Sequence, residues 1–501
     1  MGFIQKDALR TLIISYVGLI LGYVNKGVLF VLILSTEQIG LVNLILSVGI
    51  LFSQLTNLGT INSISKFLPF FKDNEYKKQS FLFHSLFIVL GGIILFTVIT
   101  ILLKDEISHF YSDKSALFVD YYYWIIPIGI SNVLFLIFET YLRSIYKNII
   151  SVIVFEFLLR ILVTILLVFL AFDIINFEVF FIIHGIIYFI PSLILFIYLI
   201  KSNEINFKRA PQKLSQKIKK IVFYYNLYSY SNTLGVMVVM TMDALMIAYF
   251  LGLKATGIYT TVIYLTNALQ LPFKSLMRVS NPLVPQYWKE KNKTKLMHLY
   301  AKTSSISLVI SLFIFLVIWL NIETIFSFLP KEYHEGIWVF LFLMIGRLVD
   351  MYFGLNGWIL ATSKKYKYDI IFTIVLIGLV FNLNLWLIPI YGITGAAIST
   401  SIAMIIYNIA RVLFLQIVYK IHPFEKNQMY IILLFLVILL APLLLPSIEM
   451  NAFLVITVKT LLISVLFLGI IISTKLNDDL NHYLENILSK VFKRTIKLSK
   501  K

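Results

Sequence analysis

Ionisable side chains recur inside the long apolar stretches of this 501-residue chain. An ionised group at the centre of a membrane helix costs about 2.5–3.5 kcal/mol on insertion scales, so it needs a partner, a cavity or a route to the interface. Arg160 and Arg347 lie near the middle of their stretches, where a guanidinium is hard to hide. A guanidinium binds phosphate oxygens through two parallel hydrogen bonds. These two arginines are the leading candidates for contact with a phosphate-bearing ligand.

Four further basic residues are candidate substrate contacts. Three of them lie near the predicted inner ends of their stretches, where a long side chain can reach the headgroups. Lys26 lies about 10 Å from the outer end of its stretch, at 1.5 Å per residue, and could also reach the interface. Lys459 lies near an outer end, and we predict it to be an interfacial anchor outside the site. The four candidates are Lys26, Arg411, Lys274 and Arg278.

Two carboxylates stand on the same helical face as the two mid-span arginines. Glu156 precedes Arg160 by four residues, and Asp350 follows Arg347 by three. This spacing favours intrahelical ion pairs, which is the alternative to ligand binding.

Residue patterns for catalysis or metal binding are missing from the sequence. It has no cysteine, no metal-type histidine spacing, no nucleotide-binding loop and no acidic pair on a loop that would bind a metal or a sugar-phosphate donor. We therefore expect no catalytic residues, no metal and no cofactor, which argues against an enzyme such as a lipid-to-sugar glycosyltransferase.

The elements that position the charged residues are predicted membrane helices. Hydrophobic residues make up 59% of the chain and charged residues 14%, whereas soluble domains carry about 25% charged residues. The apolar runs are about 20 residues long, enough to cross a hydrocarbon core of roughly 30 Å. We predict an all-α integral membrane protein with about 14 transmembrane helices. The spans are expected near residues 11–33, 39–64, 80–103, 121–142, 149–171, 177–200, 222–250, 257–279, 303–328, 337–361, 369–388, 395–419, 428–446 and 453–473.

Basic loops divide these spans into blocks. If the N-terminus is cytoplasmic, only Lys104, Lys114, Lys254 and Lys331 fall in outer loops, as the positive-inside rule requires. Both termini are then cytoplasmic. The net charge of +18 is spread over inner loops and does not form a nucleic-acid-binding face. The predicted blocks are an N-terminal lobe (1–200), a basic linker (201–221), a C-terminal lobe (222–420), two more spans (421–475) and a basic tail (476–501).

An internal repeat relates the two lobes. Gly40 follows the first span and is 29 residues before Pro69, and Gly257 is 28 residues before Pro285. Because about six spans separate the copies, both lobes enter the membrane in the same direction, related by a pseudo-twofold axis along the membrane normal. The alternative is that glycine and proline simply mark the ends of helices here.

The repeat places opposite charges at equivalent positions. Lys26 is fourteen residues before Gly40, and Asp243 is fourteen residues before Gly257. We predict that they form an ion pair between the lobes that closes one side of the protein and breaks when the lobes move. Lys26, Asp243, Glu156 and Asp350 are accordingly the candidate gating residues.

The segments around these glycines resemble a known family. Glu37-Gln-Ile-Gly40-Leu-Val-Asn, Leu58-Gly59, Phe67-Leu68-Pro69 and Met242-Asp243 before Gly257-Ile-Tyr259 are similar to flippases for bacterial polysaccharide repeat units of the O-antigen or capsule type. These belong to the multidrug/oligosaccharidyl-lipid/polysaccharide (MOP) exporter superfamily. The resemblance implies that an undecaprenyl-pyrophosphate-linked oligosaccharide crosses the bacterial inner membrane through a cationic cavity. It also implies alternating access, coupling to H⁺ or Na⁺, and other polysaccharide-assembly membrane proteins as partners.

Two other branches of this superfamily stay open. A multidrug exporter of the MATE type usually has twelve spans and would use Asp243, Glu156 and Asp350 for a cationic cargo. A lipid II flippase typically has an arginine-rich first span, which the stretch from Tyr16 to Val31 lacks. A polysaccharide polymerase or ligase would need a larger outer loop than 104–120, and the repeat argues against a channel.

Overall fold

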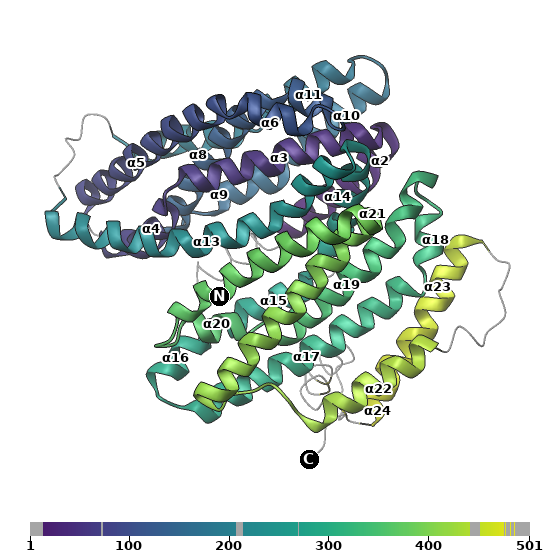
Figure 1. Cartoon of the computed structure of the whole chain (residues 1–501). Coiled ribbons are helices and arrows are strands. Elements are labelled where there is room, and N and C mark those ends of the chain that lie inside the picture. Colours follow the sequence, from purple (N-terminus) through teal and green to yellow (C-terminus); the bar gives the residue numbers. More distant parts are fainter. Residues whose placement is uncertain are drawn as a thin grey trace. The chain divides into compact units, whose positions relative to one another are not determined.

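The computed structural model describes residues 14–71, 74–206, 214–268, 270–440 and 451–474, together with 476, 481 and 485. In these parts of the chain the regular elements are helices, and no strand occurs (Figure 1). Eleven helices among the described residues are long and apolar enough to cross a membrane. The predicted all-α membrane fold is therefore confirmed. Residues 1–13 and most of the predicted tail lie outside the described residues.

Packing divides the chain into two compact units, Met1–Thr261 and Val262–Lys501. These units are defined by which parts of the chain pack together, whereas the predicted lobes are defined by the order of the membrane spans. The predicted lobe boundaries therefore stay a prediction. The first unit contains a helix at Ile14–Ile33 with a π-helical part η1 (Val24–Leu29) and α2 (Phe30–Ile33), then α3 (Thr36–Thr56), α4 (Thr60–Phe67), η2 (Leu68–Phe71), α5 (Glu75–Leu102), α6 (Lys104–Tyr111), α7 (Ala116–Asp120), η3 (Tyr122–Trp124), α8 (Ile125–Ser144), α9 (Ile149–Val152), η4 (Ile153–Leu158), α10 (Leu159–Ala171), α11 (Phe177–Ile187), α12 (Phe189–Lys201), α13 (Gln216–Phe250) and the start of α14 (Leu253–Ala268).

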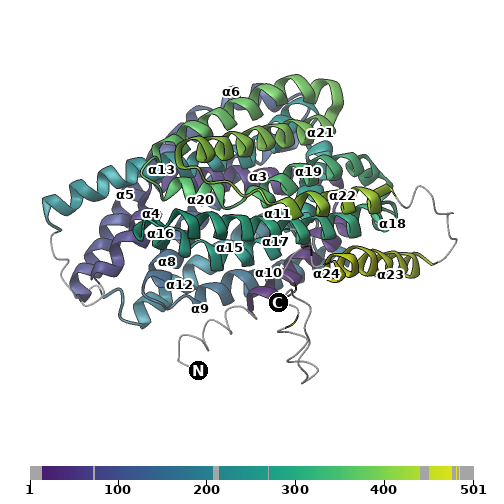
Figure 2. The ribbon, with the colours of Figure 1, turned by 90° about the horizontal axis from the view of Figure 1, so that it is seen from below.

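The second unit continues from the end of α14. Its last helices, α22 and α23, pack along α17, and Figure 2 gives a second view of them. The elements are α15 (Leu271–Ser280), α16 (Leu283–Lys289), α17 (Lys293–Trp319), α18 (Ile322–Phe326), η5 (Lys331–Glu335), α19 (Gly336–Phe353), α20 (Asn356–Ala361), α21 (Lys367–Tyr419), α22 (Lys426–Leu440), α23 (Ala452–Ile463), η7 (Ser464–Leu468) and α24 (Gly469–Ser473).

The element α21 holds two predicted spans. Its 53 residues would measure about 80 Å as one straight helix, far more than a bilayer needs. Gly392 breaks it with φ 59° and ψ −141°, three residues after Pro389. The two legs correspond to the spans predicted at 369–388 and 395–419. With α14–α15 and the short apolar α22, the described helices are consistent with about fourteen crossings.

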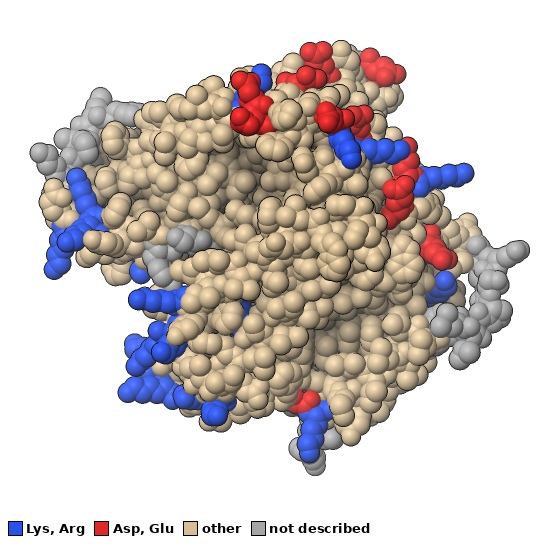
Figure 3. Space-filling view, in the orientation of Figure 1, with Lys and Arg blue, Asp and Glu red and all other residues tan. Residues whose placement is uncertain are grey.

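Charge is segregated within the first unit. Figure 3 shows Lys and Arg where α13 begins, and Asp and Glu mainly at the end that carries α6 and α11. The positive-inside rule places the segment 104–120 in an outer loop. In the structure this segment contains α6, which carries Asp105 and Glu106 in its first turn. The side with α6 is called the outer side below, following the predicted orientation.

A partly buried carboxylate just after α12 binds side chains from α5, from α8 and from the loop after α8, at the basic end of this unit. Glu204 accepts hydrogen bonds from Lys78 (3.2 Å), Lys147 (2.8 Å) and the Tyr141 hydroxyl (3.2 Å). Burial alone would raise the pKa of the Glu204 carboxyl, but the hydrogen bond from Lys147 and the two lysine charges hold it below its ordinary value of 4.5. The bond to Glu204 raises the pKa of Lys147 above 10.5.

This cluster predicts a pH-dependent contribution to stability. A carboxyl with a lowered pKa stabilises the fold above its unfolded pKa and loses that contribution as the pH falls through its folded pKa. The raised pKa of Lys147 keeps its own contribution complete up to about pH 10.5. We expect Glu204→Gln to lower the midpoint of thermal unfolding at pH 7 by about 2–4 °C or more, and the difference from wild type to shrink below pH 4.5.

Tryptophan fluorescence of the detergent-solubilised protein measures this midpoint. The control is Glu290→Gln, which breaks an exposed pair with Lys295 at 3.6 Å and should change little, because exposed pairs contribute about 0–1 kcal/mol. A gap between Glu204→Gln and wild type that stays constant down to pH 3 would contradict the role of the ionised carboxylate.

Candidate functional site

Lys26 lies in a π-helical segment of the first membrane helix. This segment, η1, covers Val24–Leu29, and π-helical turns inside α-helices are frequent at functional sites because they redirect side chains. The ammonium group of Lys26 donates a hydrogen bond to Oδ1 of Asn43 on α3, at 3.2 Å. Lys26 is therefore directed toward α3.

The neighbouring residue fixes this helix on the opposite side. Asn25 is 3% exposed; its amide donates to the carbonyl of Arg160 at 2.8 Å, and its Oδ1 accepts from Thr164 at 2.8 Å. About two turns earlier, a Cβ on Gly18 would lie 2.2 Å from the carbonyl oxygen of Glu156. The first helix thus packs closely on η4 and α10, which leaves Lys26 on its other face.

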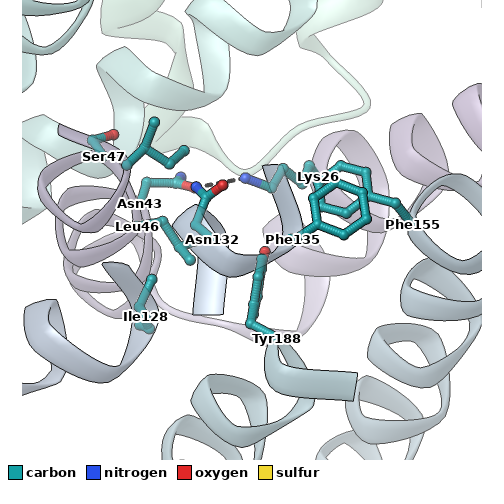
Figure 4. A pocket seen from close by; sticks show the side chains of 10 residues that line it. Lys26, Asn43, Leu46, Ser47, Ile128, Asn132, Phe135, Phe155 and Tyr188 are labelled. Atoms are coloured by element: carbon teal, nitrogen blue, oxygen red, sulfur yellow. Dashed lines mark hydrogen bonds between the residues drawn. The ribbon is translucent and has the colours of Figure 1, made fainter. Parts of the chain in front are cut away.

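Lys26 lines a cavity of about 190 Å³ within the first unit. Figure 4 shows Lys26 and Asn43 pointing toward one another, with Asn132 beside them and the Tyr188 hydroxyl turned toward the same space. The lining combines one cation with amides, hydroxyls and apolar side chains, and includes no carboxylate. Its residues are Lys26, Asn43, Leu46, Ser47, Ile50, Ile128, Asn132, Phe135, Phe155 and Tyr188.

Equivalent residues of the two repeats contact each other beside this cavity. Asn43 donates to Oγ1 of Thr260 at 3.0 Å, and these residues are 217 positions apart, the same offset that relates Gly40 to Gly257 and Lys26 to Asp243. All of these residues belong to the first unit.

The two glycines allow a close approach of helix backbones. A Cβ on Gly40 would lie 2.0 Å from the carbonyl oxygen of Leu253, and a Cβ on Gly257 would lie 1.8 Å from that of Thr36. Thr36 and Leu253 also differ by 217 positions, so the contact is symmetric. Small residues permit such packing of membrane helices. We call the contact of Thr36, Gly40 and Asn43 with Leu253, Gly257 and Thr260 the glycine seam.

Asp243 lies near the same seam. Its carboxylate accepts a hydrogen bond from the Tyr259 hydroxyl at 2.6 Å, and it is 5% exposed. Tyr259 precedes the seam residue Thr260. Lys26 and Asp243 are therefore each tied to one side of the seam, and the direct ion pair between them stays a prediction.

Arg160 has partners of its own. Its guanidinium pairs with Glu156, as the four-residue spacing indicates, and donates to the Gly18 carbonyl. Arg160 does not line the Lys26 cavity. This arrangement favours a structural use of the guanidinium, and its predicted contact with substrate stays untested.

The remaining candidates lie in the second unit. Arg347 donates to Oδ1 of Asn267 at 2.8 Å, and Asp350 accepts from the amide of Asn408 at 3.2 Å. Arg411 pairs with Asp369 and lies 4.0 Å from the centroid of the Tyr407 ring. Lys274 and Arg278 are exposed one turn apart on α15. Within the described residues, no three His, Cys, Asp or Glu side chains come together as a metal site would require.

The fold is shared with known transporters. Residues 231–386 match the MatE family model. A structure of the lipid II flippase MurJ in an inward closed conformation superposes with a TM-score of 0.71 at 14% identity, covering 93% of this chain and 99% of that chain. An inward-facing multidrug resistance MATE family transporter of the MOP superfamily gives 0.62 at 14% identity, covering 82% and 97%. The chain has the MOP superfamily fold.

A third MOP protein also shares this fold. It is a transporter from Pyrococcus furiosus for which a reversed polarity of the binding pocket suggests a different function, with a TM-score of 0.55 and 16% identity over 83% of this chain and 96% of that one. No curated protein sequence matches the chain. The predicted resemblance is thus confirmed for the MOP fold.

Proposed function

We propose that this chain is a MOP superfamily flippase that moves an undecaprenyl-pyrophosphate-linked oligosaccharide from the inner to the outer leaflet. The observation that carries the proposal is the cavity around Lys26, whose lining holds a cation among amides and hydroxyls. An ammonium group binds phosphate oxygens as a point charge. The amide of Asn132 and the hydroxyls of Ser47 and Tyr188 offer donors and acceptors for sugar hydroxyls.

The setting of this flippase is proposed from the predicted topology and from the family resemblance. It is proposed to reside in a bacterial inner membrane with both termini in the cytoplasm, to work by alternating access with coupling to H⁺ or Na⁺, and to need no cofactor. The matched proteins are transporters and flippases, in line with a transport function rather than an enzymatic one. Other polysaccharide-assembly membrane proteins are its proposed partners.

Two alternatives also have supporting observations. The match of residues 231–386 to the MatE family model and the buried Asp243 favour export of an organic cation. The superposition with MurJ favours lipid II as cargo. The cationic lining of the Lys26 cavity separates the first alternative from the proposal, since a cationic cargo would be repelled there.

A reconstituted flipping assay tests the cargo. Purified protein in liposomes is given a fluorescent undecaprenyl-pyrophosphate oligosaccharide, lipid II, or ethidium, and the outward movement of each is measured. We expect at least tenfold faster movement of the oligosaccharide lipid than in protein-free liposomes, and ethidium at the protein-free rate. Transport of ethidium alone would overturn the proposal, and transport of lipid II alone would replace the oligosaccharide by a peptidoglycan precursor.

A further inference from the structure

An apolar groove lies on the first unit, away from the Lys26 cavity. It has a volume of about 170 Å³ and is formed by Phe67, Phe70 and Phe71 on one side and Ile218, Ile221 and Val222 on the other. We call it the η2–α13 groove. It shares no lining residue with the Lys26 cavity. The cavity is lined by the middle of α3, whereas the groove is lined by residues that come after α3 in the chain. Phe70 is 79% exposed at its edge.

The two walls of the groove are held together by polar contacts beside it. The Tyr230 hydroxyl on α13 donates to the carbonyl of Leu55 at 2.7 Å, and a Cβ on Gly59 would lie 2.6 Å from the carbonyl oxygen of Asn226. The ring of Phe67 meets the ring of Tyr225 edge-on, with centroids 5.3 Å apart. These contacts fix α4 and η2 against α13, so the groove is formed without a ligand.

The surroundings of the groove are cationic. The ammonium group of Lys66 lies 3.9 Å from the centroid of the Tyr225 ring, which fixes this charge close to Phe67. Lys217, Lys219 and Lys220 are exposed on the first turns of α13. The described stretches 60–71 and 214–230 contain no Asp or Glu. An apolar groove with this charge complements an anion that carries a hydrocarbon chain.

We propose that the η2–α13 groove binds an anionic phospholipid, with an acyl chain against the phenylalanines and the phosphate at Lys66 and Lys217. Basic clusters beside membrane helices attract anionic headgroups, and Ile221 and Phe70 offer the chain an exposed apolar path. A phospholipid is favoured over the transported substrate because no residue of the Lys26 cavity takes part. By the predicted orientation, the lipid belongs to the cytoplasmic leaflet.

Photolabelling tests this site. The full-length protein is incorporated into nanodiscs with a trace of phosphatidylglycerol or of phosphatidylcholine, each carrying a diazirine on one acyl chain, and the labelled peptides are identified by mass spectrometry. We expect phosphatidylglycerol to label peptides 60–71 and 214–227 at least fivefold more than phosphatidylcholine. Lys66→Gln combined with Lys217→Gln should remove most of this preference.

The control is Lys289→Gln combined with Lys293→Gln, which removes two exposed lysines of the second unit and should leave the labelling of both peptides unchanged. Thermal unfolding confirms that each variant is folded. Equal labelling by the two lipids, or a preference that survives Lys66→Gln with Lys217→Gln, would overturn the proposal. Displacement of the label by a polyisoprenyl phosphate but not by unlabelled phosphatidylglycerol would overturn it too, because the groove would then belong to the substrate.

Discussion

Gly257→Ala is expected to separate α3 from α14 and to reduce transport more than tenfold. The added Cβ would lie 1.8 Å from the backbone carbonyl oxygen of Thr36, so the two helices must move apart to make room for it. Forcing an extra carbon into a packed contact costs about 1–3 kcal/mol. In an alternating-access transporter this cost falls only on states in which the seam is closed, so the open-seam state gains population. By the predicted orientation, the protein would then rest with its outer side open.

Cysteine labelling measures this change directly. The chain has no cysteine, so Ser47→Cys in the lining of the Lys26 cavity is the single target of a membrane-impermeant maleimide added from outside. We expect Gly257→Ala to increase its labelling severalfold. Gly91→Ala on α5 is the matched control, because its Cβ meets no heavy atom within 4 Å. Wild-type labelling and transport in Gly257→Ala would show that the seam does not gate the cavity.

Lys26→Gln is expected to reduce flipping of the pyrophosphate-linked oligosaccharide by about 10- to 100-fold. Hydrogen bonds to charged groups contribute about 1.5–3 kcal/mol, and glutamine keeps a polar hydrogen-bonding group at this position but not the charge. Lys26→Arg restores a cation and should recover part of the rate. The flipping assay described above gives the rates.

Lys459→Gln provides the comparison for this variant. Lys459 also lies within a membrane helix, but it is exposed and donates to the carbonyl of Leu320 at 3.3 Å. We expect its rate to stay within twofold of wild type. If Lys26→Gln and Lys459→Gln lose the same amount of activity, general destabilisation and not loss of a cargo contact would be the explanation.

The fold could be predicted because hydropathy and chain length determine how many helices can cross a membrane. The exceptions are local. The eighth span comprises two helices, α14 and α15, since Leu271-Pro272 starts a new helix. The thirteenth span contains α22, whose described residues are Lys426–Leu440. The turn at Gly392 follows from glycine reaching a backbone conformation that other residues avoid.

Only some residues of the candidate site could be predicted from the sequence. Lys26 could be selected because a charge in a membrane helix is costly, and Gly40 and Gly257 because they repeat. Asn43 and Thr260 were missed, although the spacing of the repeat already relates them. The π-helical turns η1 and η4 leave no sequence signal, and they place Lys26 and Phe155 at the cavity. Arg160 was a leading candidate, with Arg347, for its depth and its guanidinium group, whereas Glu156 and the Gly18 carbonyl engage it.

Positions related by the repeat contact each other in the glycine seam, and this contact restricts which residues can occupy them. Positions 40 and 257 face each other across the glycine seam, so a side chain larger than glycine at either position would meet the backbone of the other helix. A hydrogen bond such as Asn43–Thr260 needs only one donor and one acceptor, and it is satisfied equally well with the two side chains exchanged. We expect related chains to vary in a correlated way at 43 and 260, while 40 and 257 stay small together.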